Sequence, residues 1–240
     1  MDYVCLAAGK GTRFGHLGAY LQKCMYPVGL TPFLEFSVRN LRRSKHLNTE
    51  QDRLFLVVGH HSEQVENYFG DSYEGLSVSY LEQPNPLGTG HALHLAYKSI
   101  KPKTPIIAWL ADAYISTGLF EALHAHPEAN VQTVGPGSEG EKDDLKVTTK
   151  DGLVTQAWNG VEPFYDTGSW KLSPEVLALM TTQRHGEYRM VPNLQYALDE
   201  GHRLGFIKID EWLHLGGTLP TPAENVWAVA RRVLELESNP

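Results

Sequence analysis

The stretch Tyr3-Val4-Cys5-Leu6-Ala7-Ala8-Gly9-Lys10-Gly11-Thr12-Arg13-Phe14-Gly15 starts as an apolar run and then becomes a glycine-rich loop. No Asp or Glu occurs from position 3 to position 34, although the chain carries a formal net charge of −7. Glycines allow a backbone to approach a phosphate closely and to point N–H groups at it. The basic side chains of Lys10, Arg13 and Lys23 add positive charge. This stretch therefore predicts a buried strand followed by a phosphate-binding loop.

A structural turn and a dinucleotide-binding loop both fit these residues less well. A turn at the end of a strand also needs glycine, but that accounts for Gly9 or Gly11 alone and not for three basic residues in a stretch without acids. The dinucleotide fingerprint begins like Gly9-x-Gly11, yet Phe14 occupies the position of its third glycine. The loop is also not a Walker A sequence.

Composition limits the class of protein. An apolar content of 42% and a charged content of 20% are ordinary for a globular chain of 240 residues. The negative net charge argues against general nucleic-acid binding. Two cysteines suggest neither a disulfide framework nor a structural zinc site. No apolar stretch is long enough to span a membrane, and a strand so close to the N-terminus leaves no room for a signal peptide, so we expect a cytoplasmic protein.

Hydrophobic patterning alternates strands and helices through the first half of the chain. Covered strands are predicted at 3–7, 54–58 and 105–110, and a strand with alternating apolar residues is predicted at 76–81. Helices are predicted after the cap Thr31-Pro32, at 62–69 and at 88–100. This order indicates a mostly parallel sheet, in which ligands bind at the carboxyl ends of the strands. Because Asp112 follows the fourth strand, we expect it to lie near the loop at 9–13.

The second half is less regular. A hairpin is predicted at 146–157 around Asp151-Gly152, with helices at 173–181 and 190–200 and a strand at 204–209. Thr221-Pro222-Ala223-Glu224 has the form of a capping box that opens the last helix. We expect one domain with a β-rich insertion in this half.

Several motifs resemble those of the sugar-1-phosphate nucleotidylyltransferases, in the family's order. The stretch from Leu6 to Arg13, followed by Lys23, resembles the family signature, and Pro27-Val28-Gly29 with Pro32-Phe33-Leu34 is similar to its next segment. Val57-Val58-Gly59 before 66–69 is similar to its second βα unit. Gln83 with Gly88-Thr89-Gly90-His91-Ala92 is similar to its nucleobase and ribose segment, in a form closest to the UTP-using uridylyltransferases. Trp212 with Gly216, Thr218 and Pro222 resembles its late metal-site segment.

The resemblance implies an α/β fold with a Rossmann-like, mixed and mostly parallel sheet flanked by helices, the GT-A-like nucleotidyltransferase fold, with a small β-rich insertion. It implies one domain over 1–240, with a nucleotide-binding half at 1–115 and an acceptor-binding half with the C-terminal helix at 116–240. The implied reaction joins a nucleoside monophosphate unit from UTP or dTTP to a sugar 1-phosphate and releases pyrophosphate. The implied partners are these two substrates, without nucleic acid or membrane, and a homo-oligomer stays open.

The resemblance also assigns roles to residues. Arg13 and Lys23 are the expected catalytic residues at the α-phosphate. Gln83 and Gly88 are expected to recognise the base, because a Gln side chain donates and accepts together. Acceptor-binding is expected from Glu162, Asp166 and Gly168. The expected nucleotide-binding residues are Leu6, Ala8, Gly9, Lys10, Gly11, Thr12, Gln83, Gly88, Thr89 and Asp112.

The expected cofactor is Mg²⁺, with Mn²⁺ as an alternative, and Asp112 is its expected first ligand. The family places an Asp two residues after the tryptophan, where this chain has His214, and imidazole is a poorer ligand for Mg²⁺ than for softer metals. The second ligand is therefore His214, a recruited Asp210 or Glu211, or none, and another metal is an alternative. The chain also has Gln22 in place of a family proline and lacks the Lys between Glu162 and Pro163.

Two alternative functions stay open from sequence. One is a cytidylyl- or guanylyltransferase acting on another phosphate or phosphonate. The other is a non-catalytic, regulatory protein that binds a nucleotide sugar, which the substitution at His214 keeps in consideration.

Overall fold

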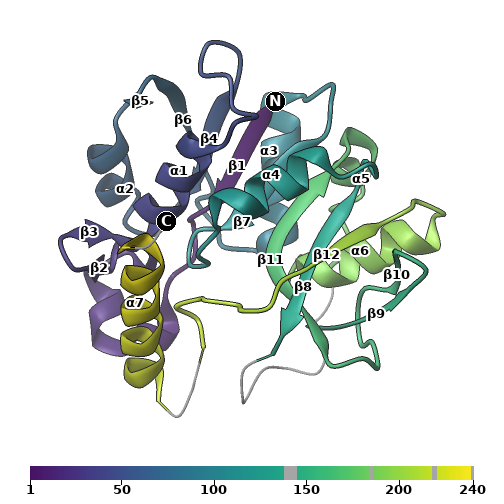
Figure 1. Cartoon of the computed structure of the whole chain (residues 1–240). Coiled ribbons are helices and arrows are strands. Elements are labelled where there is room, and N and C mark those ends of the chain that lie inside the picture. The colour runs from purple at the N-terminus through teal and green to yellow at the C-terminus, as the bar shows by residue number, and fades with distance from the viewer. Residues whose placement is uncertain (138–144, 184–185, 218–220, 239–240) are drawn as a thin grey trace.

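Ten strands join into one mixed sheet in the computed structural model, which describes residues 1–137, 145–183, 186–217 and 221–238. The strand order is β5-β6-β4-β1-β7-β11-β8-β12-β10-β9. Strand β1 (Asp2–Leu6) lies in the middle of the N-terminal half (Figure 1), parallel to both β4 (Arg53–Val58) and β7 (Ile106–Leu110). Strand β6 (Leu76–Glu82) continues this parallel half beyond β4, and β5 (Ser72–Tyr73) ends it.

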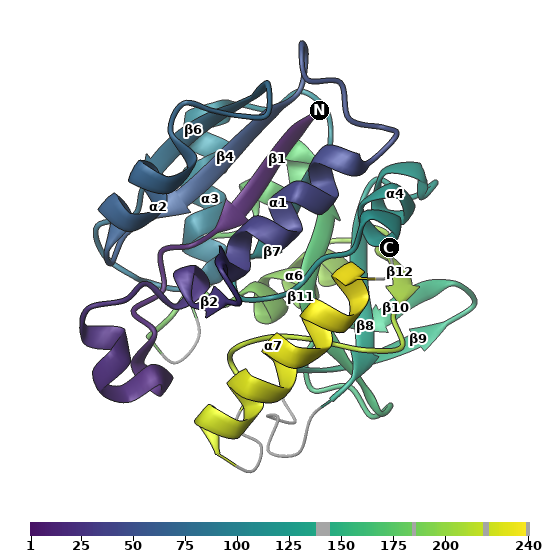
Figure 2. The same ribbon diagram turned by 60° about the vertical axis from the view of Figure 1, so that its left-hand side comes forward.

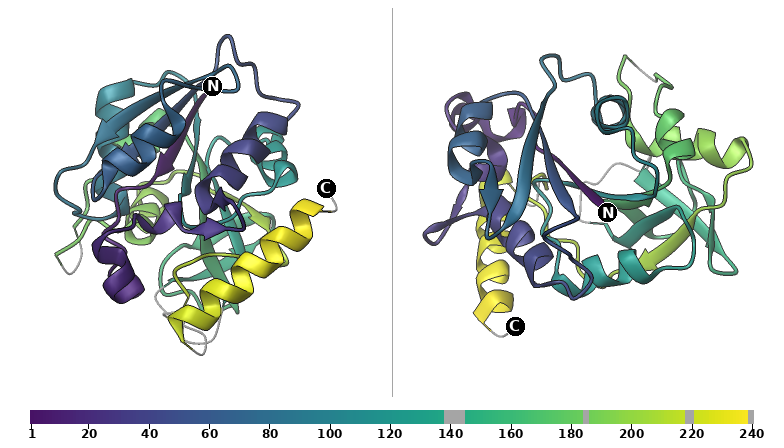
Figure 3. Two further views of the ribbon diagram at one scale, coloured as in Figure 1. Left: turned by 90° about the vertical axis from the view of Figure 1, so that its left-hand side faces the viewer. Right: turned by 90° about the horizontal axis from the view of Figure 1, so that it is seen from above.

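Side chains of β1 alternate between two apolar layers, as expected for a strand that is covered on both faces. Tyr3 and Cys5 belong to a cluster with residues of α1 (Phe33–Arg43), α2 (Ser62–Phe69) and α4 (Thr117–Ala125). Val4 and Leu6 belong to a second cluster with α3 (Thr89–Ile100), α5 (Pro174–Ala178) and α6 (Met190–Asp199). Figure 3 shows the helices on the two sides of the sheet. This sandwich fixes the carboxyl end of β1, where the glycine-rich loop begins.

The C-terminal half of the sheet is mainly antiparallel. Strand β11 (Phe164–Leu172) runs antiparallel to β7, and β8 (Val131–Pro136) and β12 (Gly205–Lys208) follow it in the sheet. The hairpin of β9 (Lys146–Lys150) and β10 (Leu153–Gln156) forms as predicted, with Asp151 and Gly152 at φ 52° and 80°. Because β9 also pairs with β11, these five strands close on themselves. The sheet is thus mixed, and parallel pairing dominates only its N-terminal half.

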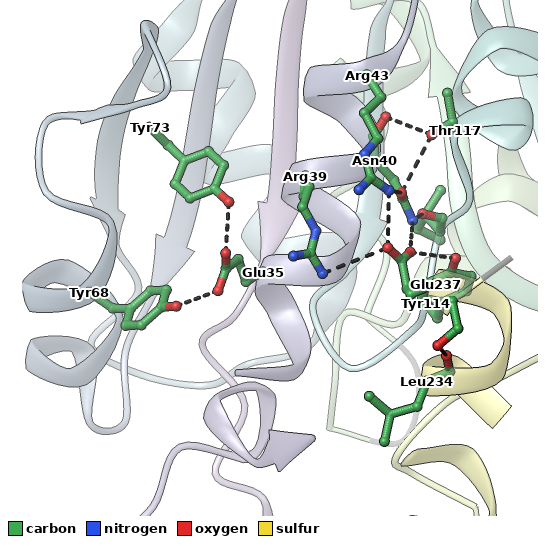
Figure 4. A network of polar contacts seen from close by, with 12 residues as sticks. Glu35, Arg39, Asn40, Arg43, Tyr68, Tyr73, Tyr114, Thr117, Leu234 and Glu237 are labelled. Atoms are coloured by element: carbon green, nitrogen blue, oxygen red, sulfur yellow. Dashed lines mark hydrogen bonds and ion pairs between the residues drawn. The ribbon is translucent and has the colours of Figure 1, made fainter. Parts of the chain in front are cut away.

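Helix α7 (Pro222–Ser238) returns to the first half of the chain and lies beside α1 (Figure 2). Val226, Val229 and Val233 of α7 share an apolar cluster with Phe33 and Phe36 of α1. At its far end, Glu237 accepts hydrogen bonds from Asn40, Arg43 and Tyr114 (Figure 4). On the other side of α1, Glu35 accepts from the hydroxyls of Tyr68 and Tyr73. The predicted cap at Thr221 is present, since Glu224 N donates to Thr221 Oγ1 at 3.3 Å, while the Glu224 carboxylate accepts from the Thr221 hydroxyl at 2.8 Å.

One predicted helix start is wrong. Thr31 and Pro32 form a short strand, β3, that pairs with β2 (Pro27–Val28), and α1 begins only at Phe33. Pro32 is extended at ψ 143°, and no side chain caps the helix. The N–H of Phe33, which a cap at Thr31 would have bound, donates instead to the carbonyl of Tyr26 at 2.9 Å. Within the described residues, no helix is both long and apolar enough to cross a membrane.

Candidate active site

A pocket of about 390 Å³ opens at the carboxyl ends of the parallel strands. It collects residues that are about a hundred positions apart in the chain, because β1 and β7 are neighbours in the sheet. The expected convergence of the glycine-rich loop with Asp112 is therefore present. Of the predicted nucleotide-binding and catalytic residues, those that line the pocket are Leu6, Ala8, Gly9, Gly11, Thr12, Lys23, Gln83, Gly88, Thr89 and Asp112.

Lys10 faces a smaller neighbouring pocket of about 250 Å³. The two pockets share Ala8, Gln83 and Pro86 in their walls, and His60 lines the smaller one. Lys10 is not among the residues that line the pocket with Lys23 and Asp112, and its expected role in nucleotide binding stays a prediction. The backbone of Arg13 lies in the 3₁₀ helix η1 (Thr12–Ala19). Its side chain is not among those described, so its catalytic role stays a prediction.

The glycine-rich loop turns sharply at Gly11, whose φ of 60° is a left-handed conformation that favours glycine. The chain then folds back on itself through η1. A Cβ at Gly18 would lie 2.7 Å from the carbonyl oxygen of Gly11, so this close return needs a glycine. The loop therefore makes a tight turn at the wall of the pocket, which is the arrangement expected for a phosphate-binding loop.

Gln22 is a residue of this site that sequence reasoning missed. Its side chain is 2% exposed, and Nε2 donates to the carbonyls of Ala7 (2.7 Å), Gly9 (3.2 Å) and His60 (3.1 Å). Its backbone N–H also donates to Gln64 Oε1 at 2.8 Å. The Gln-for-Pro departure was visible in sequence, but only the structure shows that the amide joins the phosphate loop to the β4–α2 connection. This amide therefore sets the path of the loop backbone.

Lys23 and Asp112 form an ion pair at the floor of the pocket, with side chains that are 15% and 20% exposed. A strand-like pairing of Ala113 with His214 brings the late segment beside them, and Leu215 N donates to Asp112 O at 2.8 Å. A Cβ at Gly216 would lie 3.2 Å from His214 Nδ1 and 3.3 Å from Asp112 Oδ2. The same Cβ would lie 3.4 Å from Lys23 Nζ, so all three groups surround one point.

The ring of His214 stacks on Trp212, with centroids 4.0 Å apart and an interplanar angle of 17°. Its position near Asp112 agrees with the place that the resemblance gives to the second metal ligand. Thr218 of the same motif lies outside the described residues. The alternative ligand Glu211 is paired with Arg232 instead, at 3.0 Å, and Asp210 is exposed. Among the described residues, no group of three or more His, Cys, Asp or Glu side chains could hold a metal.

The side chains at this site fit a hard divalent cation only if the cation takes most of its ligands from water and from the substrate. Mg²⁺ commonly uses one or two carboxylates and takes its other ligands from water and substrate phosphates. Asp112, with one carboxylate at the pocket floor, satisfies that requirement. A preformed protein cage is not present in the described part of the chain. A cation at this site would therefore depend on the phosphates of its substrate.

The expected acceptor residues are not in the lining of this pocket. Glu162 accepts from the N–H and hydroxyl of Thr149, at 3.0 and 2.9 Å. Asp166 is 5% exposed and accepts from Gln132 Nε2, Trp170 Nε1 and Gly168 N. Burial raises the pKa of the Asp166 carboxyl to about 6. Because its oxygens are used by protein donors inside the sheet, the structure corrects the expectation that this carboxylate faces the acceptor.

Gly168 stands behind the pocket wall. A Cβ there would lie 2.6 Å from Leu110 Cδ1, and Leu110 lines the pocket. Glu187, which sequence reasoning also missed, lines the pocket from the segment before α6. That segment is bound to the start of α3, since Gly90 N donates to Tyr188 O at 2.7 Å and Tyr188 N donates to Leu87 O at 2.8 Å. No motif in the sequence singled out Glu187.

The glycine-rich loop, Lys23 and Asp112 meet at the carboxyl ends of parallel strands, which is where open α/β sheets bind their ligands. Residues 3–199 match the MobA-like NTP transferase domain, and the chain belongs to that family.

Known relatives extend over different shares of the chain. The D-glycero-alpha-D-manno-heptose 1-phosphate guanylyltransferase of Aneurinibacillus thermoaerophilus is 31% identical over 107 residues, which cover 45% of this chain and only 44% of that protein. The UTP–glucose-1-phosphate uridylyltransferase AglF of Haloferax volcanii is 25% identical over 224 residues, 88% of this chain and 89% of that protein. A solved structure of a UDP-glucose pyrophosphorylase in complex with UDP-glucose shares the fold, with a TM-score of 0.75, 16% identity, and 98% of this chain and 99% of that chain covered.

Proposed function

We propose that this chain transfers a nucleoside monophosphate unit from a nucleoside triphosphate to a sugar 1-phosphate, with UTP or dTTP as the favoured nucleotide. The observation that carries the proposal is the pocket itself. It joins a phosphate-binding loop and the Lys23–Asp112 pair at its floor to Gln83 and Gly88, which the resemblance assigns to the base. The similar proteins named above act on sugar 1-phosphates, one with UTP and one as a guanylyltransferase.

The proposed reaction needs no side chain as a base. A phosphomonoester has its second pKa near ~6, so the sugar phosphate is largely a dianion at neutral pH. One of its oxygens attacks the α-phosphorus and forms the new P–O bond, while the bond from the α-phosphorus to the bridging oxygen of the β-phosphate breaks. Pyrophosphate leaves with the bonding electrons. The protein has to bring two polyanions together in line and offset their charge.

The residues of the pocket suit that task. Backbone N–H groups of the loop at 9–12 and the ammonium of Lys23 would hold the α-phosphate, and Arg13 remains the predicted partner of the departing pyrophosphate. A Mg²⁺ or Mn²⁺ ion, if held by Asp112 and the substrate phosphates, would offset charge on those phosphates. Among ligands from the protein, His214 would be a secondary one.

A guanylyltransferase is the second candidate, because the 31% identical relative bears that name and its matched segment spans 45% of this chain. The test for both is a matrix of UTP, dTTP, CTP, GTP and ATP against sugar 1-phosphates, with Mg²⁺ or Mn²⁺, scored by pyrophosphate release. We expect turnover with UTP or dTTP, and its loss when EDTA is added. Turnover with GTP alone would show that the nucleotide substrate is GTP and not UTP or dTTP. Stabilisation by a nucleotide sugar without any turnover would favour a regulatory binding protein.

A further inference from the structure

The side-chain amide of Gln83 is held by two neighbours at the base end of the pocket. Gln83 is 4% exposed, and its Nε2 donates to the carbonyl of Gly88 at 3.3 Å. The same nitrogen lies 2.7 Å from His91 Nδ1. The ring of His91 belongs to the first turn of α3 and lies near Tyr188, with centroids 5.9 Å apart. Gln83 therefore has both of its amide hydrogens directed at the protein.

The carbonyl of Gly88 settles which way this amide points. A backbone carbonyl can only accept, so the NH₂ group of Gln83 and not its oxygen must face Gly88. The nitrogen then offers its second hydrogen to His91 Nδ1, which must act as an acceptor. This requires the proton of the neutral ring to be on Nε2. A rotated amide would place Gln83 Oε1 against two acceptors, so His91 and Gly88 together oppose rotation.

The remaining polar atom of the side chain is the carbonyl oxygen Oε1. Among the described residues none donates to it, whereas Gln83 lines the pocket beside Gly88 and Thr89. The sequence led us to expect that Gln83 donates and accepts together. The structure corrects this, because the donor half of the amide is already used inside the protein.

We propose that His91 is a positioning residue that makes Gln83 a fixed hydrogen-bond acceptor toward the base. This rests on the proposed function only in that the pocket binds a nucleotide. A fixed acceptor selects a base with a ring N–H on its pairing edge, which uracil and thymine have at N3 and guanine has at N1. Cytosine N3 and adenine N1 are acceptors at the same edge, so they face Oε1 with a lone pair and are disfavoured.

The test is the ratio of kcat/KM for UTP to kcat/KM for CTP in the full chain. His91→Phe keeps a ring against Tyr188 but removes the acceptor, so we expect the ratio to fall by on the order of tenfold. His91→Asn can place Oδ1 where Nδ1 was and should retain the ratio. His94→Phe changes a histidine of the same helix that is not one of the two hydrogen-bond partners of the Gln83 amide, so it is the matched control and should also retain the ratio. General damage to the fold would lower both constants together and leave the ratio unchanged.

Three outcomes would overturn the inference. These are an unchanged ratio in His91→Phe, an equal loss in His91→Asn, or a parent chain that prefers CTP. A measurement on the parent chain makes the test independent of whether any variant folds: UTP methylated at N3 should bind at least about tenfold more weakly than UTP, and equal binding would refute the role of Oε1.

Calorimetric binding of UTP and CTP separates this inference from the proposed function. If no nucleotide pair gives turnover but UTP still binds more tightly than CTP, and His91→Phe removes that difference, the proposed transferase activity fails and the role of His91 stands. If turnover occurs with equal UTP and CTP constants, the role of His91 fails and the transferase activity stands.

Discussion

The side chain of Gln22 makes three polar contacts at this site, although it carries no charge. One buried amide donates to the carbonyls of Ala7 and Gly9 on the loop and to His60 on the neighbouring connection. His60 and His61 in turn donate from Nε2 to the carbonyls of Gly18 (2.9 Å) and Ala19 (3.0 Å). The connection between β4 and α2 therefore binds the loop backbone both before and after its turn.

Replacing Gln22 with Leu leaves those carbonyls without a donor in a buried place. We expect a loss of about 2 kcal/mol in the free energy of unfolding, since each unsatisfied buried group costs about 1–3 kcal/mol and relaxation recovers part of it. Nucleotide affinity should fall with it, because the loop backbone is no longer fixed. Urea unfolding and calorimetry measure both, with the exposed Gln51→Leu as control. A Gln22→Leu protein as stable as the parent would show that the amide does not hold the loop.

Charge at the pocket floor should matter more than the imidazole beside it. We expect Arg13→Ala and Lys23→Ala each to lower kcat/KM on the order of a hundredfold or more, as loss of a group that stabilises transition-state charge does. His214→Ala should lose far less, because Asp112 with substrate phosphates suffices for a hard cation. Steady-state pyrophosphate release compares them, and equal rates in parent, Arg13→Ala and His214→Ala would show that the site is wrongly assigned.

Asp166 gives the chain a pH dependence of the opposite sign to that of a salt-bridged carboxylate. Burial raises its pKa in the folded state to about 6 from an ordinary 3.8, so the folded state binds more protons between these values. This contribution to stability is present below pH ~4 and is lost as pH rises through 6, by roughly 3 kcal/mol. Urea unfolding from pH 4.5 to 7 should show this component in the parent and not in Asp166→Asn. An identical pH slope in both would contradict the assignment.

At the scale of elements, the parts that sequence reasoning predicted are those in which local pattern and burial agree. The covered strands of the first half, the Asp151-Gly152 hairpin and the cap at Thr221 all lie where expected. Strand β11 was missed because it carries polar residues that only partners across the sheet satisfy. Thr133 Oγ1, for example, donates to Ser169 O at 2.9 Å, and Asp166 is held by Gln132 and Trp170. Helix α4 and strand β8 were missed with it.

The residues of the site likewise divide into those that could be predicted from the sequence and those that could not. The loop and Asp112 could be predicted, because each follows a recognisable strand whose carboxyl end must lie at one edge of the sheet. Lys23 lies in the 3₁₀ helix η2 (Lys23–Met25) and was expected from its charge and from the resemblance. The role of Gln22 and the presence of Glu187 could not, because each depends on a contact between segments far apart in sequence. The orientation of Gln83 likewise depends on a neighbour on α3 that no spacing rule reveals.

The attachment of α7 to α1 depends on Glu237, whose side chain is 9% exposed and bonded to Asn40, Arg43 and Tyr114. Glu237→Ala should lower the free energy of unfolding by about 1–3 kcal/mol, since it leaves several polar groups without their acceptor. The matched control is Glu235→Ala on the same helix, whose pairs with Arg231 and Arg232 are exposed and should cost less than about 1 kcal/mol. Equal effects of the two changes would mean that this network does not hold the helix.

At the scale of the whole molecule, one sheet joins a parallel half that carries the nucleotide loop to a largely antiparallel half behind the pocket wall. Asp112 follows β7 and Gly168 lies in β11, and these two strands are neighbours where the two halves meet. Helix α7 closes the chain back onto the first helix, and the segment before it places His214 and Gly216 beside Lys23. The pocket is therefore lined by residues from the beginning and the middle of the chain and by Glu187, and the segment of His214 and Gly216 lies beside Lys23 and Asp112.

Our central proposal is that the protein transfers a nucleoside monophosphate unit to a sugar 1-phosphate in this pocket, by attack of the sugar phosphate on the α-phosphorus. The most direct measurement is pyrophosphate release by the parent chain and by Lys23→Ala, with UTP or dTTP, Mg²⁺ and a panel of sugar 1-phosphates. We predict release that requires both substrates and falls on the order of a hundredfold in Lys23→Ala. Two results would contradict the proposed transfer. One is pyrophosphate release without a sugar phosphate, and the other is no pyrophosphate release with any substrate pair while a nucleotide sugar still raises the Tm.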